Sequence, residues 1–269
     1  SRPFAGAVVA ALFMRRFLAP GTPWAHFDIY AWNDSSRPAR PEGGEAMGAA
    51  AAHDAAACIR QLAATQNVVR VVFAAAPSQN EFLAALRAMP DMPWGQVEAF
   101  HMDEYIGLPP DAPQSFARFL RERLFEHVPL GRVEYISGTA ADPEAEAERY
   151  SALLSERLLD IVCAGIGENG HMAFNDPPVA DFQDRKTVKI VALDAACRHQ
   201  QVHDGAFATF DDVPRTALTL TIPALMAARW IYCIVPGSTK TEAVRRALRD
   251  EISTACPATI LRRHPQATL

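Results

Sequence analysis

The chain has 269 residues, of which 49% are hydrophobic and 21% are charged, and its formal net charge is −5 at pH 7. This composition is ordinary for one or two globular domains, and it excludes disordered, collagen-like and disulfide-stabilised small proteins. The acidic balance, with a pI near 5.9, argues against nucleic acid or an anionic membrane surface as a partner. The longest apolar run, Phe4 to Met14, has 11 residues, whereas a membrane-spanning helix needs roughly 20.

The five cysteines are scattered along the chain, odd in number and never in a CxxC pair. This usage predicts free thiols in a reducing compartment, and we expect a cytoplasmic protein. His101 lies two residues from Asp103, but no third ligand at a suitable spacing accompanies them, so the sequence predicts no metal site.

The composition changes near residue 46. Residues 33–46 are rich in Pro, Gly, Ser and charge, which predicts an exposed connection. Beyond it, apolar strands alternate with helices, and Ser115 and Asp142 are suitable helix N-caps. Strands are expected at 68–75, 97–100, 133–136, 160–165, 187–193, 217–221 and 230–235, and helices at 50–62, 81–89, 115–127, 142–154 and 239–248.

This alternation predicts an α/β fold, a layered and mostly parallel sheet with helices on both faces. Ligands of such folds bind at the carboxyl ends of the strands. The loops that follow the strands are therefore where chemistry is expected.

The first such loop holds Asp103 and Glu104, directly after the strand at 97–100. Two carboxylates at a strand end could supply a general base. The residue types alone favour the simpler alternative, a solvated loop in which Asp is a turn former.

The second loop, GIGENGHMAFNDPP at 165–178, satisfies the GxGxxG pattern of dinucleotide-binding folds in its first six residues. That pattern should open a long helix, but Pro177 and Pro178 follow too soon. What remains is a glycine-lined turn that presents Asn169, His171 and Asp176 together, either as a proton shuttle or as a hydrogen-bonded structural loop.

Two further loops lead from a strand into a helix and could bind an anion. Pro236 to Lys240 places a Lys at a helix N-terminus, which is either an anion site or an ordinary capped helix. Residues 74–80, AAAPSQN, lack the glycines of a phosphate cradle.

Taken together, residues 47–269 resemble the glucosamine-6-phosphate deaminase/isomerase family, whose relatives include 6-phosphogluconolactonase. The segments that carry the resemblance occur in the family's order: FHMDEYIGLP, GIGENGHMAFNDPP, ALTLTIPAL, PGSTKTEAV and ISTACPATIL. The form of the glycine loop favours the deaminase over the lactonase. The resemblance implies the deaminase/isomerase fold, a small sugar phosphate as the substrate, and no cofactor. Members often form oligomers, so a homo-oligomer is an expectation to test.

The resemblance also implies site residues. Asp103 matches the base that moves a proton between C1 and C2 of the open-chain sugar, and His171 matches the residue that opens the ring. Asn169 stands where members have Asp or Asn, and Asp176 matches a Glu that supports the His, with a side chain one methylene shorter. Lys240 matches a phosphate-binding Lys; the other expected substrate-binding residues are Ala75, Ala76, Ser78, Gly167 and Gln201.

The phosphate-binding half departs from the family's pattern at two places. The Gly-(Gly/Ser)-Thr-Pro loop corresponds to Ala75 to Ser78, where Pro77 removes a backbone N–H. The family's phosphate-binding Arg corresponds to Gln201, and Arg198 is the neighbouring cation that could compensate. These departures suggest the same chemistry on a changed substrate.

Residues 1–46 resemble the C-terminal end of leucine aminopeptidases, through PFAGAVVAALFMRRFL, WAHFDIYAWN and RPARPEGGEA. The metal ligands and catalytic residues of that family lie upstream of this stretch, so no peptidase activity is implied. We expect this segment to be separate from a sugar-phosphate domain at 47–269. Residues 27–32 are strand-like and could join that domain's sheet.

Two alternatives to an amino-sugar-phosphate deaminase follow from the same residues. A lactonase-type hydrolase would use His171 to activate water and would not need Asp103 as a carbon base. A non-catalytic sugar-phosphate binding module would hold the ligand without turnover. A dinucleotide-dependent dehydrogenase is a more distant third.

Overall fold

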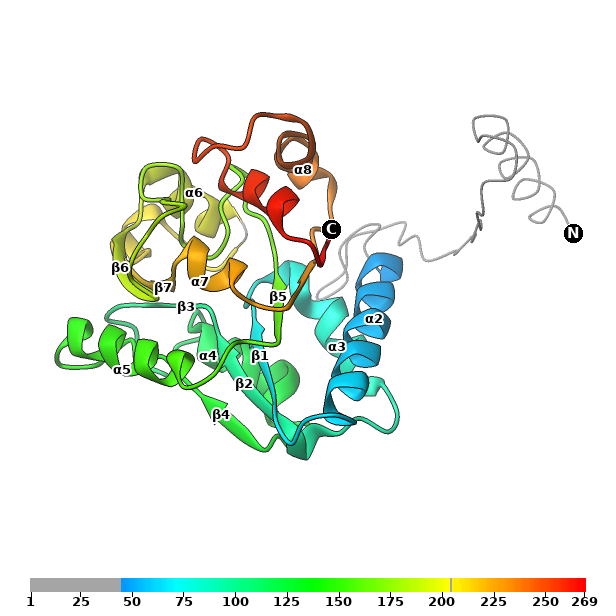
Figure 1. The fold of residues 1–269 in the computed structure, drawn as a ribbon. Helices are drawn as coiled ribbons and strands as arrows, with labels where there is room; N and C mark the ends of the chain where they lie inside the picture. The colour runs from blue at the N-terminus through cyan, green and yellow to red at the C-terminus, as the bar shows by residue number, and fades with distance from the viewer. Residues whose placement is uncertain (1–44, 204) are drawn as a thin grey trace, which may run out of the picture.

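The computed structural model describes residues 45–203 and 205–269. Residues 33–44 of the connection predicted at 33–46, the strand-like stretch at 27–32 and nearly all of the aminopeptidase-like segment therefore lie outside the described residues. Within the described ranges, strands and helices alternate as the sequence predicts (Figure 1). None of the helices in this part of the chain is long and apolar enough to cross a membrane.

The main sheet has six strands in the order β4-β2-β1-β5-β8-β9, and every pair in it is parallel. Its strands are β1 (Val69–Phe73), β2 (Val97–His101), β4 (Arg132–Glu134), β5 (Ile161–Ala164), β8 (Trp230–Cys233) and β9 (Ala267–Thr268). This sheet confirms the α/β class. The runs of β-branched and other apolar residues in β1 and β5 are buried on both faces, as expected for central parallel strands.

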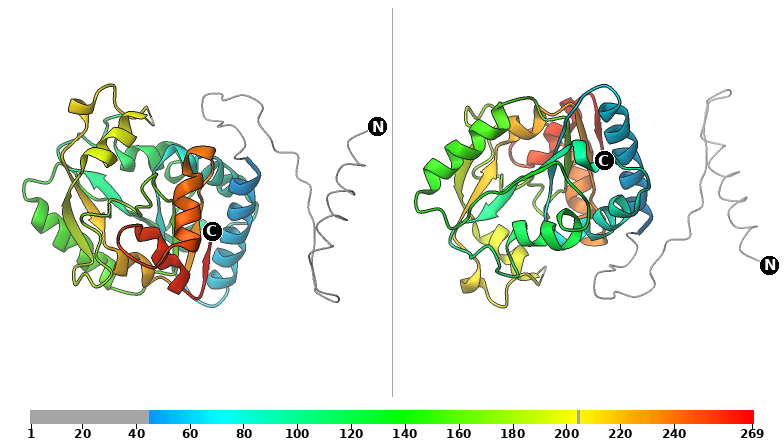
Figure 2. Two further views of the ribbon diagram at one scale, coloured as in Figure 1. Left: turned by 90° about the horizontal axis from the view of Figure 1, so that it is seen from above. Right: turned by 90° about the horizontal axis from the view of Figure 1, so that it is seen from below.

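Helices cover both faces of the sheet, because alternate side chains of each strand point to opposite sides (Figure 2). Val71 and Phe73 pack with helices α2 and α3 on one face, whereas Val72 and Phe100 pack on the other with α5, α7 and α8. The helices of the described residues are α2 (Glu45–Ala63), α3 (Asn80–Ala88), α4 (Phe116–Leu120), α5 (Pro143–Ser155), α6 (Ala195–His203), α7 (Ile222–Met226) and α8 (Thr241–Arg249).

A second, antiparallel sheet has the order β3-β7-β6, with strands β3 (Asp103–Tyr105), β7 (Thr216–Leu220) and β6 (Val188–Ala192). The strands predicted at 187–193 and 217–221 thus exist but do not belong to the parallel sheet. Strand β3 was not predicted, because Asp-Glu-Tyr carries no apolar pattern. Its pairing with β7, more than a hundred residues later, removes the Asp103 region from water.

Helix boundaries follow local chemistry. Ser115 caps α4 as predicted, its Oγ accepting a hydrogen bond from Arg118 N at 3.3 Å, and Asp142 caps α5 through Glu144 and Ala145 N–H groups. The helix expected at 115–127 changes character part-way, since Arg121–Phe125 forms a π-helical turn closed by Glu126 N–H on Arg121 O. The sequence analysis missed α6 and α7, which are short and weakly patterned.

Candidate functional site

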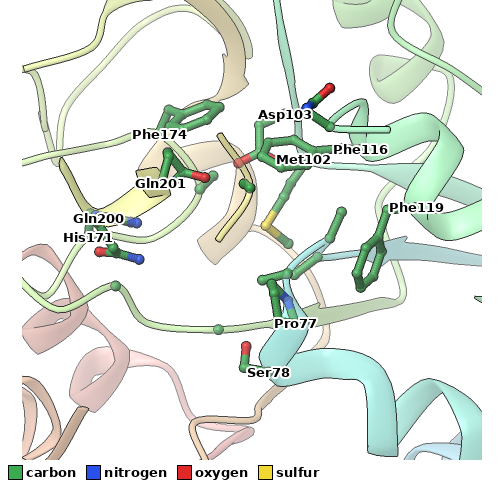
Figure 3. Close-up of a pocket in the computed structure, with 18 of the residues that line it drawn as sticks. Pro77, Ser78, Met102, Asp103, Phe116, Phe119, His171, Phe174, Gln200 and Gln201 are labelled. Atoms are coloured by element: carbon green, nitrogen blue, oxygen red, sulfur yellow. The ribbon is translucent and has the colours of Figure 1, made fainter. Parts of the chain in front are cut away.

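A cavity of about 290 Å³ lies where the carboxyl ends of neighbouring parallel strands meet (Figure 3). The segments that line it follow β1, β2, β5 and β8, with further residues from α4, α6 and the loop after α6. This is the position that the parallel topology predicts for a ligand. Eight of the ten predicted site residues line the cavity: Ala75, Ala76, Ser78, Asp103, Gly167, His171, Gln201 and Lys240.

Asp103 is 7% exposed and lies in β3, immediately after β2 turns into the second sheet. The solvated loop that its residue type favours is therefore the wrong interpretation. No described residue hydrogen-bonds its carboxylate, which leaves the side chain open toward the cavity. Burial, together with repulsion from Glu104, holds the pKa of Asp103 well above its usual value. A carboxylate in this state is a stronger proton acceptor than an exposed Asp.

His101 fixes the backbone of Asp103 from behind. Its Nδ1 faces the Asp103 carbonyl oxygen at 2.9 Å, and its Nε2 accepts a hydrogen bond from Ile136 N–H at 2.8 Å. Because Nε2 is an acceptor, Nδ1 carries the proton and the ring is neutral. Complete burial lowers the pKa of His101 to about 4, so the ring supports the chain rather than exchanging protons.

Glu104 has a different task from its neighbour. Its carboxylate accepts hydrogen bonds from Ser115 Oγ at 2.8 Å, Ala117 N at 2.9 Å and Phe116 N at 3.2 Å, and so anchors the start of α4. Burial raises the pKa of Glu104, although these bonds work in the opposite direction. Successive side chains of a strand point to opposite faces, so Asp103 points toward the cavity and Glu104 toward the start of α4.

The glycine loop, Gly165 to His171, follows β5. No helix forms between this loop and β6, so the helix that a dinucleotide-binding pattern requires does not exist here. A Cβ on Gly167 would lie only 2.1 Å from Cε1 of the His171 ring. Gly170, at φ +88, makes the turn. The glycines therefore let the imidazole fold back over the loop, with Gly167 N–H donating to His171 O at 3.0 Å.

Asn169 and Asp176 do not line the cavity but hold His171 from behind. The His171 Nδ1 lies 2.8 Å from Asn169 Oδ1 and 2.9 Å from Asp176 Oδ1. Asn169 Nδ2 in turn donates to Asp176 Oδ1 at 2.7 Å. Both atoms that face Nδ1 are acceptors, so Nδ1 carries the proton and Nε2 is left as the basic nitrogen. Asp176 therefore reaches the imidazole with its shorter side chain.

The charge on Asp176 is stabilised in place. Burial acts to raise its pKa, but hydrogen bonds from His171, Asn169 and the Cys197 thiol, together with the attraction of His171, keep the pKa of Asp176 below its usual value. Asp176 is 1% exposed. An ionised, buried carboxylate behind the imidazole stabilises the imidazolium that forms when Nε2 takes a proton.

We call the opposite side of the cavity the loop end; it comprises Ala75 to Ser78 and the cations Lys240 and Arg123, all of which line the cavity. Pro77 begins a 3₁₀ turn that leads directly into α3, so the backbone there offers one N–H fewer to an anion. Gln79 joins the loop to β8 by donating from Nε2 to Ile234 O at 3.1 Å. Figure 3 shows Pro77 and Ser78 across the cavity from Gln201 and Phe174.

Gln201 lines the cavity as predicted, and Tyr105 Oη donates to its Oε1 at 2.7 Å. Arg198, the expected compensating cation, is not in the cavity wall. Its Nη2 donates to the carbonyls of Phe210 and Val213, and its guanidinium lies 3.9 Å from the centre of the Phe210 ring. That expectation was wrong, because α6 turns Arg198 toward the segment after it.

Arg123 is a charged residue of the cavity wall that sequence reasoning missed. It lies 20 positions after Asp103 in a helical segment that reads as an amphipathic surface helix. Only the packing of that segment against α3 brings it to the cavity, through Arg123 Nε donating to Asn80 Oδ1 at 2.6 Å.

Comparison with known proteins agrees with this architecture. The family model for glucosamine-6-phosphate isomerases and 6-phosphogluconolactonases matches residues 42–269. The chain belongs to this family. Among curated relatives, the glucosamine-6-phosphate deaminase of Exiguobacterium sp. (strain ATCC BAA-1283 / AT1b) is 40% identical over 173 residues, and that of Bacillus cytotoxicus (strain DSM 22905 / CIP 110041 / 391-98 / NVH 391-98) is 39% identical over 173 residues. These alignments cover 64% of this chain and 66% and 64% of the two relatives, just under two thirds of their length.

Solved structures share the fold over most of the described chain. One described as a monomeric glucosamine-6-phosphate deaminase of the NagB superfamily superposes with a TM-score of 0.76 at 29% identity, covering 83% of this chain and 92% of that one. The 6-phosphogluconolactonase of Thermotoga maritima superposes with a TM-score of 0.65 at 21% identity, covering 79% and 90%. At that identity the second likeness shows the fold alone.

Proposed function

We propose that this protein isomerises and deaminates an amino-sugar phosphate, with glucosamine 6-phosphate as the first substrate to test and fructose 6-phosphate and ammonia as the products. The observation that carries the proposal is the pairing of Asp103 and His171 in one cavity. One is a buried carboxylate to which none of the residues that the structure describes donates a hydrogen bond, and the other is an imidazole with its proton fixed on Nδ1. The family and the deaminase relatives support the same reaction.

The chemistry follows from these two groups. His171 Nε2 takes the proton of the anomeric hydroxyl and returns it to the ring oxygen, which opens the sugar to an aldehyde. The Asp103 carboxylate takes the proton from C2 and returns it to C1, while a proton passes from the amino nitrogen to the C1 oxygen; C1 becomes a hydroxymethyl group and an imine forms at C2. Water adds to that imine, the C–N bond breaks, and ammonia leaves a ketose phosphate. C1 is reduced as C2 is oxidised, so the oxidation change stays within the substrate and needs no external oxidant or reductant.

Each supporting residue has a role in this scheme. Asn169 and Asp176 keep the His171 imidazole in its tautomer and orientation, and Gly167 leaves room for the ring. Ala75, Ala76, Ser78, Gln201 and Lys240 would contact the substrate, with Lys240 on its phosphate. The net reaction consumes water, so the enzyme would be a hydrolase as well as an isomerase. The free, buried cysteines fit a cytoplasmic location.

The proposal is tested by ammonia release from the purified chain with glucosamine 6-phosphate. We expect release that depends on the phosphate, with unphosphorylated glucosamine as a weak substrate. His171→Ala should lower kcat by about 10²–10⁴, the usual size of a general acid–base contribution. Absence of ammonia from a folded sample would overturn the proposal for this substrate and turn the search to other amino sugars.

Asp103→Asn separates this reaction from the lactonase alternative that the family also contains. A lactonase would need His171 to activate water but no base for a carbon proton. We therefore expect Asp103→Asn to abolish isomerisation. Retained hydrolysis of 6-phosphogluconolactone by that variant, with no ammonia from the wild type, would identify a lactonase instead. Saturable binding of the sugar phosphate without any turnover would identify a binding module.

A further inference from the structure

The loop end of the cavity provides few of the contacts that a phosphate group usually receives. Pro77 has no N–H, and no glycine lies between Ala74 and Gln79 to let the backbone wrap around an anion. Gln201 is neutral and already accepts the hydrogen bond of Tyr105 Oη. Arg198 is occupied elsewhere. A substrate phosphate must therefore be neutralised by other groups in the cavity wall.

The cations that line the cavity are Lys240 and Arg123. We propose that Arg123 is a specificity-determining residue which, with Lys240, binds the phosphate monoester of the substrate at the loop end. This inference deepens the proposed function and rests on that function for the identity of the sugar. The binding of phosphate by Arg123 can be tested without knowing the sugar.

The guanidinium is held in place by contacts that do not consume its charge. Its carbon lies 3.9 Å from the centre of the Phe119 ring, and Phe119 itself lines the cavity. On the other side, Arg123 Nε donates to the neutral Asn80 Oδ1 at 2.6 Å. Asn80 begins α3 two residues after Ser78, so this bond ties the guanidinium to the loop end.

Neutralisation of the Arg123 charge within the protein is weak. The nearest carboxylate oxygen, Glu122 Oε2, lies 3.7 Å from Nη1, and the Glu122 side chain is 46% exposed. Nη1 also approaches Phe119 O at 3.5 Å, and no described residue accepts a hydrogen bond from Nη2. A planar guanidinium with one free edge matches the oxygens of a phosphate, which it can contact at two points.

The π-helical turn at 121–125 adds to this geometry. The extra residue in such a turn changes the direction of the side chains that follow, and π turns within helices occur often at functional sites. Burial lowers the pKa of Arg123, although the group remains a cation at neutral pH. A partly withdrawn cation whose neighbouring acid, Glu122, is itself 46% exposed still gains from an anionic ligand.

The first test measures binding of inorganic phosphate by calorimetry to the full chain and its variants. Arg123→Gln keeps a group that can bond Asn80 but loses the charge. We expect it to weaken binding about tenfold or more, as expected for a lost charge-assisted contact. Arg123→Lys should lose less, and Lys240→Gln should lose a comparable amount. Arg121→Gln is the matched control, since Arg121 lies in the same turn, pairs with Asp111 and does not line this cavity.

The second test compares kinetics with and without the phosphate. For Arg123→Gln we expect KM for glucosamine 6-phosphate to rise about tenfold with little change in kcat, and no change with unphosphorylated glucosamine. If Arg123→Gln binds phosphate as tightly as the wild type and has the same thermal stability, the inference is overturned. Lys240 would then be the cation that binds the phosphate without help from Arg123.

The two proposals fail in different ways. A wild type that binds phosphate through Arg123 but releases no ammonia would retain this inference and reject the deaminase. A wild type that deaminates amino sugars yet shows no phosphate affinity would retain the deaminase and reject this inference.

Discussion

The glycine loop and the loop end are two walls of one cavity, and they are built in different ways. Around His171, each polar group contacts another at 2.7–3.0 Å, through Asn169 and the buried Asp176. At the loop end, the two cations approach from separate elements, Arg123 from the turn after α4 and Lys240 from the turn before α8. The comparison suggests that the reacting centre is fixed tightly, while recognition of the substrate's anion depends on a few separable contacts.

The difference has a physical basis. A proton transfer needs its groups within a few tenths of an ångström, so the imidazole must be held by several partners at once. Binding an anion depends mainly on net positive charge and on a few donors, and these can come from different parts of a chain. Substitutions in the glycine loop should therefore lower kcat, whereas substitutions at the loop end should change KM.

Among the substitutions that test this comparison of the two walls, the largest effect is expected for Gly167→Ala. The added Cβ would lie 2.1–2.4 Å from atoms of the His171 ring, so the imidazole must leave its position against Asp176. We expect kcat for ammonia release to fall by about 10², the cost of misplacing a catalytic group by roughly 1 Å. Steady-state kinetics of the purified variant measure the loss.

Gly95→Ala is the matched control for this variant, because nothing lies within 4 Å of the Cβ it would add. It should keep the wild-type kcat. If Gly167→Ala retains full activity, the imidazole does not act from the position that the structure gives it. The close contacts around His171 would then not be needed for catalysis.

A gain of function is expected at Gln201, which lies across the cavity from Pro77 and Ser78 of the loop end (Figure 3). Gln201→Arg adds a third cation to the cavity that Lys240 and Arg123 also line. We expect KM for glucosamine 6-phosphate to fall about tenfold with kcat nearly unchanged, and the gain to shrink at high salt. Gln201→Met serves as the control, since it removes the hydrogen bond with Tyr105 Oη without adding charge. An unchanged KM in Gln201→Arg would mean that substrate binding is not limited by positive charge in the cavity.

Much of this fold could be predicted from local sequence. The β-branched run before Ala74 and the apolar run before Gly165 predict buried parallel strands, and capping residues such as Ser115 and Asp142 mark where helices begin. The parallel topology then places the loops after these strands at one edge. The cavity lies at that edge, because carboxyl ends of parallel strands always meet on the same side.

What the sequence could not predict depends on contacts between distant segments. Strand β3 exists only because it pairs with β7, and no apolar pattern in Asp-Glu-Tyr reveals that partner. For the same reason Asp103 was expected in a solvated loop if judged by residue type alone. Arg123 reaches the cavity through packing of its turn against α3, and Arg198 is turned away by α6. Neither orientation is visible from residue spacing.

The smallest effect is expected on stability, from Asp103→Asn. This variant tests whether the buried carboxylate that the proposed reaction needs also destabilises the fold. Burial and Glu104 raise the pKa of Asp103 above its value in the unfolded chain. The native state therefore holds this proton more tightly than the unfolded chain does. The loss of stability from ionising Asp103 is thus absent below the unfolded pKa and grows as the pH rises through the folded pKa.

Asp103→Asn, which keeps the shape without the charge, should raise the free energy of unfolding by about 1 kcal/mol at pH 8 and raise Tm by roughly 2–4 °C. Thermal unfolding of the wild type and of Asp103→Asn from pH 4 to pH 8 should show the difference in Tm growing with pH. A gap that does not depend on pH would mean that the Asp103 carboxylate is not destabilised in the fold, and the base would have to gain its strength from the bound substrate instead.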